Sequence, residues 1–174
     1  MALRPGDAVL EVGVGSGRNL PYLLDAVGPS GHVTGVDLSA GMVAEADKLL
    51  HRRGATNVDL IVADASTVEL DRTFDAVLFS LSYSVIPAAK RPAALARAWE
   101  RLRPGGRLVV FDGGIARTRL RPLIAPIVRL LTRLGPGHPD TRPGDDLARY
   151  GEVVSEAALL DIYFVYTVTR PATG

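Results

Sequence analysis

Short apolar runs and amphipathic stretches alternate along the first two-thirds of the chain. The runs are almost continuously apolar, which is typical of strands covered on both faces, and they occupy residues 8–12, 32–36, 57–62, 74–80 and 107–111. Stretches with helical spacing lie between them, at residues 19–27, 39–53 and 88–102. Because parallel strands joined by helices require right-handed crossovers, this pattern predicts a doubly wound α/β fold around an open, mostly parallel sheet.

Turn-forming residues mark the ends of the predicted elements. The run Gly-Pro-Ser-Gly at residues 28–31 ends the first helix. Ser39 can cap the N-terminus of the second helix, and Gly54 can end that helix in the left-handed conformation. The run Pro-Gly-Gly at residues 104–106 turns the chain into the fifth strand. These signals support the same order of strands and helices as the apolar pattern.

The chain changes character after residue 112. Residues 114–138 contain five Arg and no acidic residue, and their apolar positions recur at helical spacing: Leu120, Leu123, Ile124, Ile127, Val128, Leu131 and Leu134. This pattern predicts a basic helix. Two β-rich runs follow, at residues 151–155 and 163–170, with a break near Asp161 that predicts an antiparallel hairpin. With this hairpin, the predicted sheet has about seven strands.

Composition narrows the possible chemistry. Cysteine is absent from the 174 residues, which excludes disulfides, thiolate metal sites and a cysteine nucleophile, and we expect no metal site. A formal net charge of +1 provides no global basic field, so a nucleic-acid partner is not expected. No apolar run approaches the roughly 18 residues of a membrane span, and no signal-peptide pattern opens the chain. These features favour a cytoplasmic protein.

Polar and glycine residues follow the predicted strands at their carboxyl ends, where doubly wound sheets bind ligands. The first strand ends in a loop containing Gly13, Gly15 and Gly17. The second strand ends at Asp37 and the third near Asp64. Because the carboxyl ends of parallel strands lie along one edge of a sheet, we expect these residues to share one site.

The glycine loop favours a nucleoside with a cationic end over a dinucleotide. Its spacing is G-x-G-x-G, whereas a dinucleotide fingerprint is G-x-G-x-x-G, and the acidic Glu11 would be a poor neighbour for a pyrophosphate. Asp37 follows Gly17 by 20 residues, which suits a carboxylate that accepts both ribose hydroxyls. Asp64 suits an exocyclic amine. The structural alternatives are a strand-to-helix turn for the loop, a helix-capping role for Asp37 and an exposed turn for Asp64.

Four segments together resemble the successive motifs of the class I S-adenosylmethionine-dependent methyltransferases. They are Val9–Gly17 (VLEVGVGSG), Gly35–Ser39 (GVDLS), Ala63–Ala65 (ADA) and Leu102–Leu108 (LRPGGRL). The resemblance covers about residues 5–112 and is looser in the tail. It implies a Rossmann-like fold, and it implies S-adenosylmethionine as the cofactor and S-adenosylhomocysteine as the product.

The resemblance also implies a role for individual residues. Those expected to border the methionine end of the cofactor are Glu11, Gly13, Gly15, Gly17, Asn19 and Ser80. Asp37 would hold the ribose, and Leu38 and Met42 would pack on the adenine. Asp64 and Ala65 would contact the amine edge of the adenine. No residue is predicted to be a catalytic acid or base, because methyl transfer from a sulfonium depends mainly on holding donor and acceptor in line.

Within this class, the chain is most similar to the methyltransferases of ubiquinone and menaquinone biosynthesis and to bacterial phospholipid N-methyltransferases. The similarity lies in Gly17–Tyr22 (GRNLPY), Asp37–Met42 (DLSAGM) and Ser82–Pro87 (SYSVIP). The fourth strand is not followed by the N-P-P-Y type signature of methyltransferases that act on nucleobase or amide nitrogens. The resemblance therefore implies a small or lipid-like acceptor.

The expected domain organisation is a single methyltransferase domain over residues 1–174. Residues 1–112 would form the cofactor-binding half, and residues 113–174 would form the basic helix and the hairpin. The helices that usually precede the first strand in this family, where they cover the cofactor, are expected to be absent because that strand begins by residue 8. Residues 66–73 are also too few for a long helix. Recognition of the acceptor is therefore not predicted.

Three functions remain open at this point. The first is methyl transfer to a small or lipid-like acceptor by in-line displacement. The second is phospholipid N-methylation at a membrane surface, with residues 117–134 in peripheral contact through their Arg side chains, although an ordinary helix covering the sheet would have the same pattern. The third is cofactor binding without turnover. Neither the identity of the acceptor nor the oligomeric state is predicted.

Overall fold

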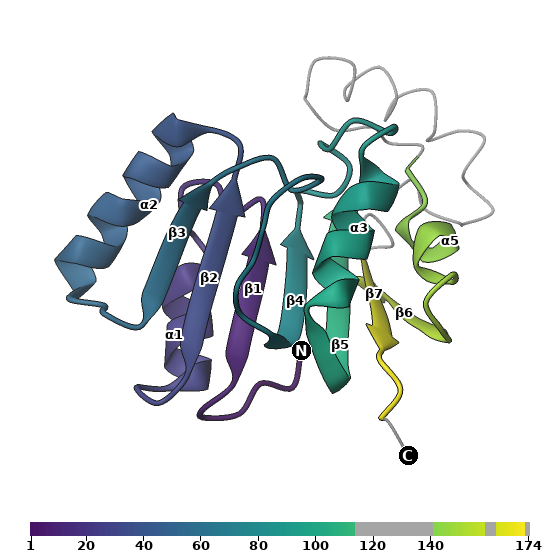
Figure 1. Ribbon diagram of the computed structural model, residues 1–174, viewed down its shortest axis with the longest axis horizontal. Coiled ribbons are helices and arrows are strands. Elements are labelled where there is room, and N and C mark those ends of the chain that lie inside the picture. The colour runs from purple at the N-terminus through teal and green to yellow at the C-terminus, as the bar shows by residue number, and fades with distance from the viewer. Residues whose placement is uncertain (114–140, 159–162, 173–174) are drawn as a thin grey trace.

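Seven strands form one sheet in the order β3-β2-β1-β4-β5-β7-β6 (Figure 1). The structure is a computed structural model that describes residues 1–113, 141–158 and 163–172. In chain order, the elements are β1 (Ala8–Val12), α1 (Leu20–Val27), β2 (His32–Asp37), α2 (Ala40–Arg53), β3 (Val58–Val62), β4 (Phe74–Ser80), α3 (Arg91–Glu100), β5 (Leu102–Gly113), α5 (Pro143–Leu147), β6 (Val153–Ala158) and β7 (Tyr163–Thr169).

The pairing of the strands confirms the predicted fold class. Strands β3, β2, β1, β4 and β5 run parallel to one another, whereas β7 is antiparallel to both β5 and β6. The order reverses between β1 and β4, because the chain builds outward first to β3 and then to β5. The carboxyl ends of β1 and β4 therefore border the crevice in which this kind of sheet binds ligands.

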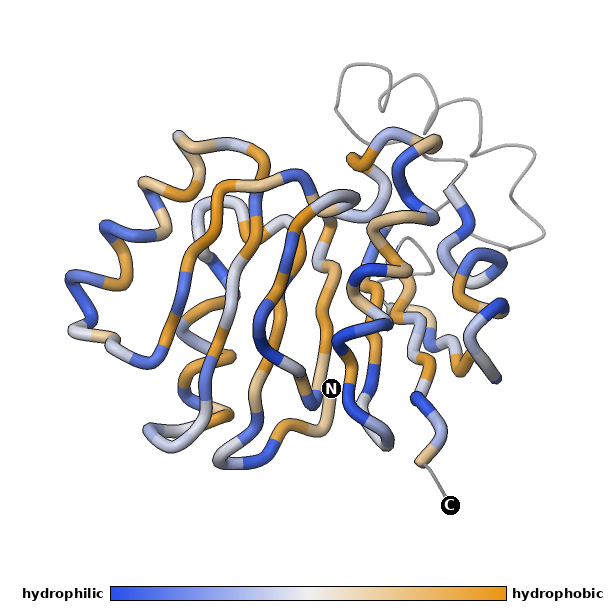
Figure 2. The backbone as a smooth tube through the Cα atoms, in the orientation of Figure 1, coloured by the Kyte–Doolittle hydropathy of each residue, from blue (hydrophilic) through white to orange (hydrophobic). Residues whose placement is uncertain are grey.

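Helices cover both faces of the sheet, as the continuous apolar strands predicted. One core cluster joins α1 and α2 to Val9 of β1 and Val33 of β2. The other joins α3 and α5 to Leu10 of β1 and Val77 of β4, because alternate residues of a strand point to opposite faces. Figure 1 shows α3 and α5 on the side facing the viewer, and Figure 2 shows the hydrophobic residues gathered in the central strands.

Several elements differ from their expected bounds, and one was not expected. Strand β6 spans Val153–Ala158 rather than residues 151–155. Helix α3 begins at Arg91 rather than at residue 88, because Pro92 lies in its first turn, where proline is favoured. Strand β5 begins at Leu102 rather than at residue 107, because Leu102 pairs with Phe74 before a bulge interrupts the ladder. The five-residue helix α5 was not predicted, since it is too short for a periodic pattern. The helix expected within residues 114–138 lies outside the described residues.

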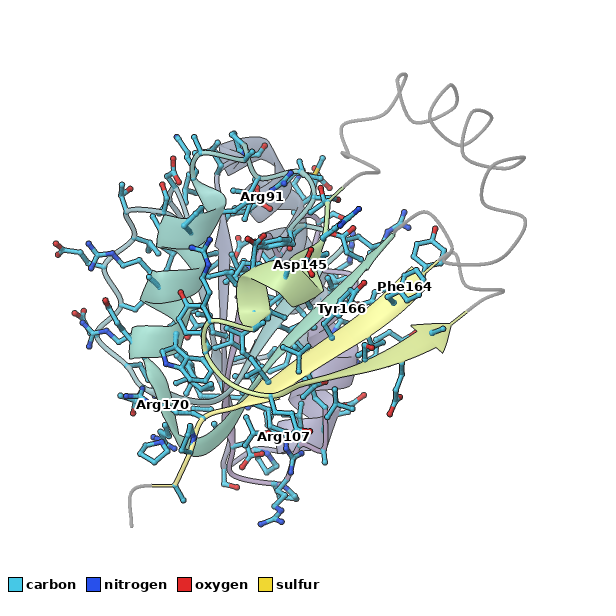
Figure 3. All side chains as sticks on the ribbon, turned by 90° about the vertical axis from the view of Figure 1, so that its right-hand side faces the viewer. Arg91, Arg107, Asp145, Phe164, Tyr166 and Arg170 are labelled. Carbon is cyan, nitrogen blue, oxygen red and sulfur yellow. The ribbon has the colours of Figure 1, made fainter. Side chains whose placement is uncertain are left out.

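Arg170 joins the end of β7 to the turn between α3 and β5. Its Nη1 donates hydrogen bonds to the carbonyl oxygens of Trp99, at 2.9 Å, and of Glu100 and Leu102. Carbonyl groups at the end of a helix have no partner within the helix, so the guanidinium satisfies groups that would otherwise depend on water. Figure 3 shows Arg170 at the foot of the sheet, where the C-terminal strand leaves it.

We expect the substitution Arg170→Met to lower the free energy of unfolding by about 1–3 kcal/mol, because three carbonyl oxygens lose a charged donor. The measurement is urea unfolding followed by circular dichroism. Arg149→Met, at an exposed arginine, is the matched control and should change the free energy by less than about 0.5 kcal/mol. Equal effects of the two substitutions would contradict the role assigned to Arg170.

Candidate functional site

A cavity of about 350 Å³ opens at the carboxyl ends of β1, β2, β3 and β4. The segments that line it are far apart in the sequence but meet at this edge of the sheet. They contribute Val12, Gly13, Gly15, Val36, Asp37, Leu38, Met42, Ala63, Asp64, Ala65, Leu81, Ser82, Val85, Ile86, Pro87 and Lys90. Seven of the residues predicted for the site are among them. Glu11, Gly17, Asn19 and Ser80 are not among the lining residues.

The three glycines of the loop after β1 all have positive φ, but their surroundings differ. A Cβ on Gly13 would lie 2.3 Å from the Cβ of Ser82, so only glycine lets the ends of β1 and β4 approach each other. A Cβ on Gly15 would meet nothing within 4 Å, so open space borders the loop at that residue. A Cβ on Gly17 would lie 2.9 Å from Leu20 Cδ1 and 3.0 Å from Ala46 Cβ, so glycine lets the loop lie close to α1 and α2.

Asp37 ties the end of β2 to the glycine loop. Its Oδ2 accepts a hydrogen bond from the Gly15 backbone N–H at 2.8 Å, and its Oδ1 accepts one from the Ser39 N–H at 2.9 Å. The Ser39 side chain caps α2, as predicted, by accepting from the Met42 N–H at 3.3 Å. Leu38 and Met42 follow on the rim of the cavity, where they are 71% and 49% exposed. Two apolar side chains thus remain uncovered beside the carboxylate.

Asp64 lies at the next strand end and is held on both carboxylate oxygens. Oδ1 accepts hydrogen bonds from the Ser66 backbone N–H at 2.9 Å and from the Ser66 hydroxyl at 2.7 Å. Oδ2 accepts one from Lys90 Nζ at 2.5 Å. These hydrogen bonds, the one from Lys90 first, hold the pKa of the Asp64 carboxyl well below its usual range. Asp64 is therefore a fixed carboxylate at the cavity.

Glu11 is a buried carboxyl group directly before the cavity. It is 1% exposed, and Asn19 Nδ2 donates a hydrogen bond to its Oε1 at 2.6 Å. Its Oε2 is buried and has no hydrogen-bond partner in the part of the chain that the structure describes. Burial raises the pKa of Glu11 from 4.5 to about 7, with the Asn19 hydrogen bond acting in the opposite direction. Asn19, expected from the resemblance to lie at the same end of the site, is thus in contact with Glu11.

The residues after β4 form a wall of the cavity, the β4 ledge, which we define as Leu81–Pro87. Leu81 has a φ of 54°, a conformation that non-glycine residues rarely adopt, and its side chain is 48% exposed at the cavity. Val85 is 44% exposed on the same ledge. Ser80, the last residue of β4, is half-buried and pairs with Phe111 of β5.

Hydrogen bonds to β1, β5 and α3 help to hold the β4 ledge in place. The Ser82 hydroxyl donates to the Val12 carbonyl at 2.6 Å. The buried Asp112, at the end of β5, accepts from the Ser84 N–H at 2.7 Å and from its hydroxyl at 2.9 Å. Arg91 of α3, labelled in Figure 3, donates to the carbonyl oxygens of Ile86 and Ser84. The ledge is therefore rigidly positioned before any ligand binds.

Sequence reasoning did not single out Asp112, Arg91 or Lys90. Asp112 carried a signal that was available, since an aspartate directly after an apolar run resembles Asp37 and Asp64 in position. Lys90 and Arg91 carried no such signal, because nothing in the local sequence tells where their side chains lie.

Residues 117–134, considered for a membrane contact, lie outside the described residues. In the part of the chain that the structure describes, no group of His, Asp and Glu could hold a metal ion.

The family model described as "Methyltransferase domain" matches residues 9–106, which is more than half of the chain. This chain belongs to the class I S-adenosylmethionine-dependent methyltransferases. S-adenosylmethionine is therefore its cofactor, as the sequence predicted. No helix among the described residues is long and apolar enough to cross a membrane.

Curated relatives of this methyltransferase differ in their acceptors. It is 38% identical over 122 residues to aklanonic acid methyltransferase DauC of Streptomyces sp. (strain C5). The aligned region covers 70% of this chain and 54% of the relative. It is 32% identical over 112 residues to the ubiquinone/menaquinone biosynthesis C-methyltransferase UbiE of Ectopseudomonas mendocina, covering 63% of this chain and 43% of the relative. The chain spans about half the length of these relatives or less.

A solved structure supports the same assignment. The S-adenosylmethionine-dependent methyltransferase SibL in its apo form superposes with a TM-score of 0.78 at 26% identity, over 95% of this chain and 50% of that one. The phosphoethanolamine N-methyltransferase 2 of Haemonchus contortus has the same TM-score at 16% identity, over 97% and 50%, and shows the fold alone. The sheet of this chain is therefore the methyltransferase sheet.

The buried Glu11 should make stability depend on pH. Its pKa is about 7 in the native protein and near 4.5 when exposed, so between these values the native state binds more protons than the unfolded state. The free energy of unfolding should therefore fall as the pH rises from about 5 to 7, by at most about 3 kcal/mol from this group. We expect Glu11→Gln to remove this component, so that its melting temperature depends less on pH.

Thermal melts of both proteins between pH 5 and pH 8 test this expectation. Glu152→Gln, at an exposed glutamate, is the control and should keep the pH profile of the unaltered protein. If Glu11→Gln also kept that profile, Glu11 would not titrate in this range.

Proposed function

We propose that the cavity binds S-adenosylmethionine and that the protein transfers its methyl group to a small or lipid-like acceptor. One observation carries the proposal: a single cavity brings together the glycine loop, the carboxylates of Asp37 and Asp64, and the apolar β4 ledge. A nucleoside needs the polar part of this lining. An apolar acceptor would find its contacts on the ledge.

The residues present fit the cationic end of this cofactor. The buried Oε2 of Glu11 has no hydrogen-bond partner among the described residues, and a buried carboxylate oxygen without a partner is costly unless a cation or donor reaches it. The methionine part of the cofactor carries an ammonium group, which would provide that charge. Gly15 leaves open space beside the loop, where the ligand could approach the backbone. These two features favour Glu11 and the loop as the methionine side of the site.

The nucleoside would occupy the other side of the cavity. Each oxygen of the Asp37 carboxylate accepts one backbone N–H, which leaves further lone pairs for the two ribose hydroxyls. Leu38 and Met42 are exposed apolar side chains at the rim, and an adenine ring would cover them. Asp64 is a fixed carboxylate that could accept a hydrogen bond from the adenine amine.

Catalysis would depend on position rather than on proton transfer. The cofactor supplies an activated methyl group on a positively charged sulfur. The task of the chain is to hold the acceptor in line with that methyl group and to exclude water, which accounts for large rate accelerations in reactions of this kind. The hydrogen-bonded β4 ledge is suited to this task, because Ser82, Ser84 and Ile86 are fixed by three different elements.

We further propose that the acceptor is apolar in part and that the chain groups with the methyltransferases of quinone and phospholipid biosynthesis. The exposed Leu81 and Val85 on the ledge support an apolar contact. A relative named as a ubiquinone/menaquinone biosynthesis C-methyltransferase supports the quinone part of this grouping. Residues 1–174 would act as one domain, because β6 and β7 extend the sheet that residues 1–113 begin.

Calorimetric titration with S-adenosylhomocysteine tests the cofactor site. We expect the protein to bind it and not to bind NAD. Asp37→Ala should weaken the binding at least tenfold, because it removes charge-assisted hydrogen bonds to the ribose. Asp47→Ala, at an exposed aspartate of α2, is the control and should bind like the unaltered protein. Binding of NAD without S-adenosylhomocysteine, or an unchanged affinity of Asp37→Ala, would contradict the proposal.

The affinity for S-adenosylhomocysteine should also rise with pH. Glu11 is partly protonated below about pH 7, and the ligand's ammonium group favours the ionised carboxylate, so binding below that pH releases a proton. Titrations at pH 6 and pH 8, in buffers of different ionisation enthalpy, measure both the affinity and the protons released. Glu11→Gln should show a smaller pH dependence. An affinity independent of pH in the unaltered protein would exclude Glu11 from the site.

A further inference from the structure

One of the two lysines of the chain lies at the cavity. The chain has 18 Arg but only two Lys, Lys48 and Lys90, so a lysine ammonium group is rare in this protein. Lys90 lines the cavity directly before α3, and its side chain is 50% exposed. Lys48 lies on α2, where it pairs with Glu45 at 2.8 Å, and both side chains of that pair are well exposed. The two lysines thus form similar ion pairs in different places.

The ion pair of Lys90 engages only part of its hydrogen-bonding capacity. An ammonium group has three donors, and one of them is directed to Asp64 Oδ2. No second hydrogen bond joins the Lys90 ammonium to any residue that the structure describes. An ion pair this exposed contributes at most about 1 kcal/mol to stability, so stability alone is a weak reason for its place.

The Ala65 backbone N–H is a second unused donor at the same edge of the cavity. Ala65 lines the cavity beside Asp64, and its N–H forms no hydrogen bond with the described residues. The edge therefore offers one carboxylate acceptor, on Asp64, and two kinds of donor, on Ala65 and Lys90. Adenine presents the complementary set, since its amine donates and the ring nitrogens N1 and N7 on either side of it accept.

We propose that Lys90 is a specificity-determining residue of the cofactor site, whose ammonium donates a hydrogen bond to N7 of the adenine. Asp64 would accept from the amine, and the Ala65 N–H would donate to N1. The ion pair with Asp64 would then also position the Lys90 ammonium, because it holds that group next to the carboxylate to which the adenine amine would donate. This inference rests on the proposed function, since it assigns the adenine to the Asp64 edge of the cavity.

The test uses S-adenosylhomocysteine and its 7-deaza analogue, in which a C–H group replaces N7. Calorimetric titration compares the unaltered protein with Lys90→Met, which keeps the length of the side chain but removes the ammonium. The unaltered protein should bind S-adenosylhomocysteine roughly tenfold more tightly than the analogue, the usual effect of one charge-assisted hydrogen bond. Lys90→Met should lose this factor toward S-adenosylhomocysteine and bind both ligands with similar affinity.

Lys48→Met is the matched control, because it removes the same charge from an exposed ion pair away from the cavity. It should discriminate between the two ligands as the unaltered protein does. Circular dichroism checks that each variant folds, and Lys90→Gln provides a second substitution at the site.

Three outcomes would overturn the inference. Equal binding of both ligands by the unaltered protein would show that nothing contacts N7. Unchanged discrimination in Lys90→Met would assign the contact to another residue. An equal loss toward both ligands in Lys90→Met would reduce Lys90 to a support for Asp64. If the unaltered protein bound no S-adenosylhomocysteine, the proposed function would fail first, and the inference would fail with it.

Discussion

The close approach of β1 and β4 at the carboxyl edge of the sheet is the constraint on which the site depends. Gly13 makes this approach possible because it has no side chain. The Ser82 hydroxyl stabilises it by donating a hydrogen bond to the Val12 carbonyl. The glycine loop and the β4 ledge are thereby fixed relative to each other. The ladder between β1 and β4 sets the spacing of the two strands, and this contact extends it to the segments that follow them.

Negative charge at this edge is distributed rather than concentrated. Asp37 is stabilised by two backbone N–H groups, and Asp64 by Ser66 and Lys90, so each carboxylate is fixed without the other. Glu11 is different, because it is buried, one of its oxygens has no partner within residues 1–113, 141–158 and 163–172, and it is partly protonated near neutral pH. This edge of the sheet therefore combines two hydrogen-bonded aspartates with a buried glutamate whose pKa is raised by burial. This division suits a ligand that has hydroxyl groups and an amine at one end and a cation at the other.

Local signals account for the parts of the structure that could be predicted from the sequence. The apolar strands are long and continuous, so the sheet was predicted correctly, and Asp37 and Asp64, which follow two of these strands, both line the cavity. The parts that were missed depend on contacts over long sequence separations. The Ser82 hydroxyl donates a hydrogen bond to the Val12 carbonyl, 70 residues earlier. Asp112 accepts one from the Ser84 N–H, 28 residues earlier. The first residues of β5 were missed because pairing with Phe74, not local propensity, extends that strand.

The backbone at Leu81 limits how this ledge can diverge among related proteins. At a φ of 54°, β-branched residues are strongly disfavoured, whereas glycine, asparagine and aspartate are tolerated. Val85 is under no such restriction, although it is exposed on the same ledge. The side chain at residue 85 can therefore be exchanged more freely than the one at residue 81. The backbone conformation at Leu81 thus restricts one residue of the ledge and leaves the side chain at residue 85 free to vary.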